Sequence, residues 1–201
     1  MTARLLIALA LLAATRPALA SEPGFVSTAR VVVARHGSDL MALARDTLDG
    51  AVLRSELDPI VPMPGTPAPF GVFVTLVKDQ ETRGCFGSME PGGKTLEALI
   101  MEGAVGAARL DPRVKPLSSA ELAEVQIILS FVGPTVPVLT VGELDPKRHG
   151  LMVRAGERRS VLLPGEAKTA SWSLRRNLRQ AGIRRNQHYE MFRFQTVTLY
   201  E

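Results

Sequence analysis

The stretch GVFVTLVKDQETRGCFGSM (71–89) predicts a β-hairpin from which the rest of the fold can be worked out. Apolar residues alternate along its first half, so that Val72, Val74 and Leu76 share one face of a strand. The polar residues 78–81 mark a turn, and the return strand covers 83–89. This return strand carries the only cysteine of the chain, which makes the hairpin the first place to look for chemistry.

Downstream of the hairpin, helices and strands are mixed without a regular βαβ order. In chain order the pattern predicts a helix at 94–111, a short capped helix at 117–125, a strand at 125–133, a hairpin at 149–164, a helix at 170–183 and a strand at 191–200. The sequence therefore predicts an α+β domain with a mainly antiparallel sheet flanked by helices.

Upstream of the hairpin, the sequence predicts one helix followed by a loop. Apolar residues recur at helical spacing between Leu40 and Val52, and Ser38 or Asp39 is the expected N-cap. Five prolines in 57–70 favour an extended loop, because proline lacks the amide hydrogen that helices and central strands need.

The first twenty residues have the three parts of a secretory signal peptide. Arg4 gives a positive start, 5–14 is an apolar run too short to span a membrane comfortably, and the small residues 18–20 precede Ser21. We expect cleavage after Ala20 and a periplasmic or secreted protein. The alternative is an uncleaved N-terminal anchor.

Residues 21–37 are interpreted as a leader, flexible over 21–28, and 38–201 as a single domain. Removing residues 1–20 takes away Arg4 and Arg16, so 22 Lys+Arg face 20 Asp+Glu and the formal charge falls from +4 to +2. This balance is not typical of a nucleic-acid-binding protein. No second apolar stretch is long enough to cross a bilayer, so we expect no stable membrane insertion after cleavage.

Several stretches together resemble the AMMECR-type domain family. The family signature is a strand reading GVFVTL, a turn, and then Arg-Gly-Cys-Ile-Gly; here GVFVTL is 71–76 and RGCFG is 83–87. The family then has an alanine-rich helix leading into Asp-Pro-Arg-Phe, which is similar to AVGAARLDPRV at 104–114. The resemblance continues in order over about 40–200, through the predicted hairpin and the ending MFRF.

This resemblance implies a two-lobed α+β fold with an antiparallel sheet in the larger lobe, but no settled reaction. Bacterial members are associated with a Memo-like protein and a radical-SAM protein. An exported member would be separated from cytosolic SAM, so a Memo-like protein is the candidate partner. The chain departs from the family after Leu163-Pro164, where Gly165-Glu166 replaces the usual Gln-Val. If that segment shapes a pocket, specificity changes with it.

Cys85 has two interpretations. One is a nucleophile or ligand-contacting thiol, with Arg83 stabilising its thiolate and with Gly84 and Gly87 allowing a bulge or the close approach of a ligand to the backbone. The other is a buried packing residue, the usual state of a free cysteine. Arg83 and Cys85 share a face only if the strand is regular.

A nucleophilic cysteine generally needs a base, and His149 at the start of the second hairpin is the candidate, against the alternative of a plain turn residue. Asp111 and Arg113 form a second cluster. Arg113 either binds a carboxylate or phosphate of a ligand as a fork, or pairs with Asp111 where that residue ends its helix. One cysteine and three widely spaced histidines predict no metal site, and we expect no cofactor.

Arg175, Arg176 and Arg179 occupy one side of a predicted helix and form the most basic patch, either solvated or attractive to an anionic surface or an acidic partner. Trp172 is expected in the core. Three functions stay open. They are an enzyme-like domain with a Cys85-centred cleft for a small anionic or peptide substrate, a non-catalytic ligand- or protein-binding module working with a Memo-like partner, and a structural subunit of an assembly.

Overall fold

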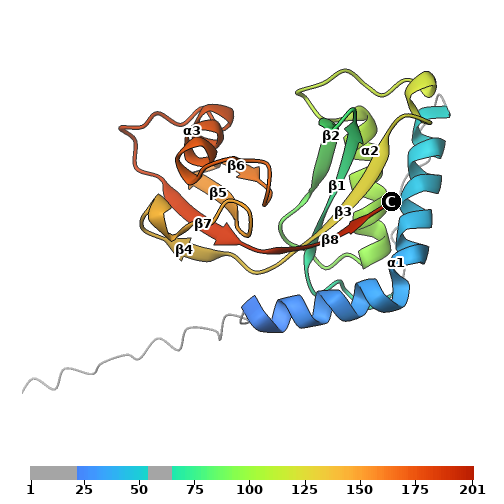
Figure 1. The fold of residues 1–201 in the computed structure, drawn as a ribbon, viewed down its shortest axis with the longest axis horizontal. Helices are drawn as coiled ribbons and strands as arrows, with labels where there is room; N and C mark the ends of the chain where they lie inside the picture. The colour runs from blue at the N-terminus through green and yellow to red at the C-terminus, as the bar shows by residue number, and fades with distance from the viewer. Residues whose placement is uncertain (1–21, 54–64) are drawn as a thin grey trace, which may run out of the picture.

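A computed structural model describes residues 22–53 and 65–201, and within them the chain forms two lobes (Figure 1). The first lobe is built on a sheet of β1 (Gly71–Lys78), β2 (Glu81–Ser88), β3 (Gln126–Val132) and β8 (Thr196–Tyr200), in the order β2-β1-β3-β8. All its strand pairs are antiparallel, as they are in the second lobe. The predicted α+β class and two-lobed fold are confirmed.

The second lobe contains a sheet of its own, where the sequence predicted a hairpin, a helix and part of the last strand without assigning them a separate sheet. Its order is β4-β7-β5-β6, formed by β4 (Val136–Val138), β5 (Gly150–Ala155), β6 (Arg158–Leu162) and β7 (Glu190–Phe194). Helix α3 (Ala170–Gln180) packs on β5 and β6. The last strand, predicted as one element over 191–200, is split at Gln195 into β7 and β8, which belong to different sheets. This segment joins the lobes along the bottom of Figure 1.

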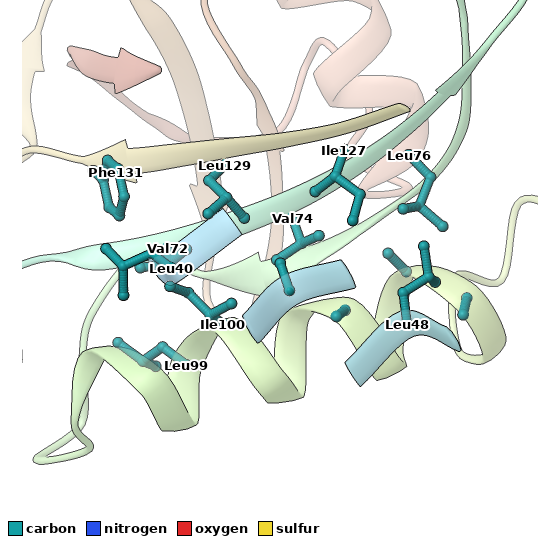
Figure 2. Packing of buried hydrophobic residues seen from close by; sticks show 14 of the residues in the cluster. Leu40, Leu48, Val72, Val74, Leu76, Leu99, Ile100, Ile127, Leu129 and Phe131 are labelled. Carbon is teal, nitrogen blue, oxygen red and sulfur yellow. The ribbon is translucent and has the colours of Figure 1, made fainter. Parts of the chain in front are cut away.

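The core of the first lobe follows from the alternation along β1. Val72, Val74 and Leu76 pair in register with Phe131, Leu129 and Ile127 of β3, and all six side chains are fully buried. Figure 2 shows these side chains directed towards Leu99 and Ile100 of α2 (Leu96–Arg109) and towards Leu40 and Leu48. One face of the sheet is thus covered by helices, and the other face points towards the second lobe.

The long helix α1 (Glu22–Leu53) corrects the prediction of a leader. The helix begins at Glu22 rather than at a cap on Ser38 or Asp39, so residues 22–37, predicted as leader, are helical. Phe25 is only 7% exposed because its ring packs edge-on against Phe70 at 5.8 Å. Figure 1 shows α1 bent into two arms, and Gly37-Ser38 in its middle is the kind of pair at which helices bend. The sequence missed this because Phe70 is distant in the chain.

Two short connections complete the fold. The hairpin turn has left-handed backbone at Asp79 (φ 52°) and Gln80 (φ 64°), as a two-residue turn that matches strand twist requires. The 3₁₀ turn η1 (Ser119–Glu121) stands where the sequence predicted a short helix, and a second 3₁₀ turn, η2 (Val141–Glu143), follows β4. The predicted signal peptide, residue 21 and residues 57–64 of the proline-rich loop lie outside the described residues, and 65–70 form irregular backbone. Within the described ranges, no helix is long and apolar enough to cross a membrane.

Candidate functional site

The uncovered face of the first sheet forms a cleft with the second lobe. A cavity of about 680 Å³ lies between Thr75, Ile128, Ser130, Thr196 and Thr198 on the sheet and the segment 162–166 with Arg176 on the other lobe. These side chains come from alternate positions of β1, β3 and β8, opposite to the buried apolar rows. The apolar side chains that form the core of the first lobe lie on the helix-facing side of the sheet. The cleft side can therefore carry the hydroxyl groups of threonine and serine.

A second cavity of about 440 Å³ adjoins this cleft and contains Cys85. It is lined by Phe73, Cys85, Asp111, Arg113, Leu163 and Glu166, among others. Leu163 and Glu166 line both cavities, so they stand between the two spaces. The structure thus brings together Cys85, Asp111 and Arg113, as the sequence suggested.

Cys85 lies half-buried at the end of a side-chain row that crosses the cleft floor. Its register partner is Thr75, which pairs in turn with Ile128, and Thr75 Oγ1 donates to Cys85 Sγ at 3.3 Å. Burial raises the pKa of the Cys85 thiol to about 11, an effect that the Thr75 hydrogen bond and Arg113 only partly offset and that Glu166 and Asp111 reinforce. Since the thiolate is the nucleophile, the site holds Cys85 in its unreactive form at neutral pH.

Asp111 and Arg113 close the edge of the first sheet. Strand β2 is an edge strand, so its outer side has no neighbouring strand. On that side the backbone amide of Cys85 donates to Asp111 Oδ2 at 2.9 Å. Arg113 donates three hydrogen bonds to the Asp111 carboxylate. One comes from its backbone amide, and two come from its guanidinium, through Nε at 2.9 Å and Nη2 at 2.7 Å. Burial alone would raise the pKa of Asp111, but these donors outweigh it and hold the pKa below its ordinary value. Helix α2 ends at Arg109, two residues before the end that the sequence predicted at Asp111.

Arg83 is directed away from the cavities by a β-bulge. Leu76 pairs with Gly84 while Val77 pairs with Thr82, so Arg83 is the extra residue on β2. Its guanidinium binds Glu121 at 2.7 Å and 3.1 Å, and it donates to the carbonyl oxygen of Lys115 at 2.9 Å. The Arg83 donors, followed by those of Ser118, lower the pKa of Glu121 to about 2. The arginine that lowers the pKa of Cys85 is Arg113, whereas one sequence interpretation gave that role to Arg83.

Gly84 and Gly87 are explained by contacts within the chain. A Cβ at Gly84 would lie 2.2 Å from the carbonyl oxygen of Ala107 on α2. One at Gly87 would lie 2.2 Å from the carbonyl oxygen of Val72 on the neighbouring strand. Both are far inside van der Waals contact, so these glycines let β2 approach α2 and β1 closely. Neither glycine lines the cavity that contains Cys85.

His149 is part of a turn and is not among the residues that line the Cys85 cavity. Its Nδ1 accepts from the backbone amide of Asp145 at 3.1 Å, and its own amide donates to the Asp145 carbonyl at 2.7 Å. These contacts fix the entry to β5. The structure thus places His149 in the turn at Asp145, and its role as a base for Cys85 stays a prediction.

Glu166 is the site residue that sequence reasoning missed as a candidate. It accepts from the amide of Leu163 at 2.6 Å and interacts electrostatically with Arg113 and Arg176. Burial raises its pKa, and these partners only partly compensate. The available signal was the departure at Gly165-Glu166, which places an acid where the resembled family has an apolar residue. Among the described residues no group of three His, Cys, Asp or Glu side chains is arranged to hold a metal ion.

Comparison with known proteins places this geometry in a family. The AMMECR1 family model matches residues 41–199, which include the hairpin, Asp111, Arg113 and Glu166. The chain belongs to the AMMECR1 family. A relative from Thermotoga maritima is 38% identical over 135 residues, covering 65% of this chain and 77% of the relative. Protein MK0488 of Methanopyrus kandleri is 39% identical over 111 residues, or 51% of this chain and 53% of its own length.

The fold is shared with a solved structure. The crystal structure of the uncharacterized protein PH0010 from Pyrococcus horikoshii matches with a TM-score of 0.68 and 22% identity, covering 81% of this chain and 89% of that one. At this identity the likeness concerns the fold. The chain therefore has the AMMECR1 fold. The chemistry of the cleft depends on its own residues, because one fold can support many functions.

Proposed function

We propose that this protein is a binding domain whose inter-lobe cleft holds a short peptide or a similar amide-bearing molecule. The observation that carries the proposal is the hydroxyl-rich face of the first sheet, which the helices leave uncovered. This face and the second lobe enclose a cavity of about 680 Å³. Hydroxyls donate and accept hydrogen bonds, as peptide groups do, and Leu162 and Leu163 supply an apolar wall. A cavity of this size fits a small ligand.

Binding is favoured over catalysis by the state of Cys85. A nucleophilic thiol needs a lowered pKa and a base that is oriented towards it. Here burial raises the pKa of Cys85 to about 11. Arg83 is bound to Glu121, and His149 to the turn at Asp145. Cys85 is therefore a wall residue of the cavity that adjoins the cleft, held by Thr75 and by the amide contact to Asp111.

Alkylation of Cys85 tests this choice. Raising a thiol pKa from 9.0 to about 11 lowers the thiolate fraction at pH 8 roughly a hundred-fold, so iodoacetamide labelling of the folded protein is expected to be slow and to rise steeply only above pH 10. The same chain unfolded in urea is the control. A labelling midpoint below about 8.5 in the folded state would restore the nucleophile hypothesis.

The peptide-binding proposal is tested with a tripeptide library screened by thermal shift. Members that stabilise the protein are expected to lose about tenfold in affinity for the double variant Thr196→Val/Thr198→Val, since two hydroxyl contacts of about 0.7 kcal/mol each disappear. Thr47→Val is the matched control, because that hydroxyl bonds to the Leu43 carbonyl on α1 outside the cleft. Equal binding to all three proteins, or no stabilising tripeptide, would reject the proposal.

Location and partner are further parts of the proposal. The pattern in residues 1–20 supports export, and a mature chain beginning at Ser21, found by N-terminal sequencing, would agree with it. A Memo-like protein carrying its own signal peptide is the partner to test by co-purification from the same compartment.

A further inference from the structure

A third cavity lies between α3 and Arg113 of the loop that follows α2, and four of its six lining residues are arginines. Its volume is about 470 Å³, and its walls are Arg113, Trp172, Arg175, Arg176, Arg179 and Gln180. It shares Arg113 and Gln180 with the Cys85 cavity and Arg176 with the cleft. We call it the arginine pocket.

The three helical arginines of the pocket have no acidic neighbour on their own helix. Positions 172, 175, 176 and 179 fall on one face of α3, and that helix contains no acidic residue. In the described part of the chain, none of Arg175, Arg176 and Arg179 forms an ion pair within salt-bridge distance. Like charges at this spacing destabilise a helix, so an anion that bridged them would be stabilised in turn.

The pocket is also partly ordered before any ligand arrives. Trp172, which the sequence placed in the core, is half-buried at the pocket wall, with the Arg176 guanidinium 5.1 Å from its ring centroid. Arg113 is held by its fork to Asp111, which leaves Nη1 without a partner among the described residues. A preordered guanidinium loses less entropy on binding than a free one.

The acidic groups near the pocket do not cancel its charge. Asp111 is paired with Arg113, and Glu166 faces Arg113 and Arg176. Arg175 and Arg179 remain, beside the amide of Gln180. A single guanidinium can bind a carboxylate through two parallel hydrogen bonds. Several guanidinium groups along one helix can together bind a ligand group with more charged oxygens, such as a phosphate.

We propose that the arginine pocket binds the phosphate groups of a small molecule, with Arg175 and Arg179 as the main contacts and Arg113 and Arg176 at its inner edge. This site adjoins the hydroxyl-lined cleft at Arg176. Its two main residues, Arg175 and Arg179, line neither the cleft nor the Cys85 cavity, so the proposal does not depend on what the cleft holds.

Pyrophosphate is the probe, and Trp172 is the reporter, because it is the only tryptophan of the chain. Titration at constant low ionic strength is expected to give a saturable change in tryptophan emission, as the anion draws Arg176 from the indole ring. The double variant Arg175→Gln/Arg179→Gln is expected to weaken binding at least about tenfold, the effect of losing two charge-assisted contacts. Both side chains are exposed, so the fold and melting temperature should be preserved.

The matched control is Arg184→Gln/Arg185→Gln, which removes the same charge from exposed positions nearby that do not line the pocket. Its affinity for pyrophosphate should stay within about threefold of the original, the residual long-range effect of net charge. Equal losses in both variants would mean a diffuse field rather than a site. No saturable response, or binding to vesicles of anionic lipid without binding to pyrophosphate, would also overturn the proposal.

Discussion

Replacing Asp111 by alanine is expected to lower the free energy of unfolding by about 3 kcal/mol. The Asp111 side chain is only 2% exposed, and it accepts from Cys85 N and from three donors of Arg113. Without it, the edge amide of β2 and the Arg113 guanidinium lose their partner. We place the loss at the lower end of the range for a broken buried pair, because Arg113 is 40% exposed and water recovers part of it.

Urea unfolding followed by circular dichroism measures this effect. Asp49→Ala is the control, since Asp49 forms only a long 3.9 Å contact with Arg45 and should change stability by less than about 0.5 kcal/mol. Asp111→Asn should retain part of the stability, because the amide oxygen still accepts one bond. If Asp111→Ala were as stable as the Asp49 control, the carboxylate would have no role in holding β2 to the end of α2.

Replacing Gly84 by alanine is expected to destabilise the protein by about 3 kcal/mol, the upper end of the usual range for overpacking. The added methyl would sit 2.2 Å from the Ala107 carbonyl oxygen, and backbone cannot move aside as a side-chain end can. Strand β2 and α2 would have to separate. Because Cys85 follows Gly84, its amide would also be drawn from Asp111, so the thiol should become more reactive towards iodoacetamide.

Gly142→Ala is the matched control for this variant. A Cβ there meets nothing closer than Thr140 Oγ1 at 3.6 Å, an ordinary contact, so the melting temperature should hardly change. A Gly84→Ala protein as stable as Gly142→Ala would show that the strand tolerates a side chain. The glycine would then need another explanation, such as the ligand contact that the sequence suggested.

The features that were read correctly from the sequence are local ones. The alternation of Val72, Val74 and Leu76 and the polar turn after Lys78 each depend on neighbours within a few residues. The same is true of the end of α2 before Asp111, since the proline that follows cannot continue a helix well. The clustering of Cys85, Asp111 and Arg113 came from family resemblance rather than from spacing.

The features that were misread depend on contacts between distant segments. The single strand over 191–200 became β7 and β8 because each half pairs in a different sheet. The start of α1 was missed because Phe25 is buried by Phe70. The sequence left open whether Arg83 shares a face with Cys85. The bulge and the Glu121 carboxylate, thirty-eight positions away, turn Arg83 outwards.

The sequence by itself determined the first hairpin, the position of α2 to within two residues at each end, and the α+β class, because hydrogen bonding and side-chain periodicity act over a few residues. Only the tertiary structure decided what the site is. Burial in the finished cleft raises the pKa of Cys85, and the packing of α2 against β2 accounts for Gly84. The approach of the second lobe brings Glu166 and Arg176 towards the cleft floor. These effects arise from desolvation and contact between segments, which no local pattern encodes.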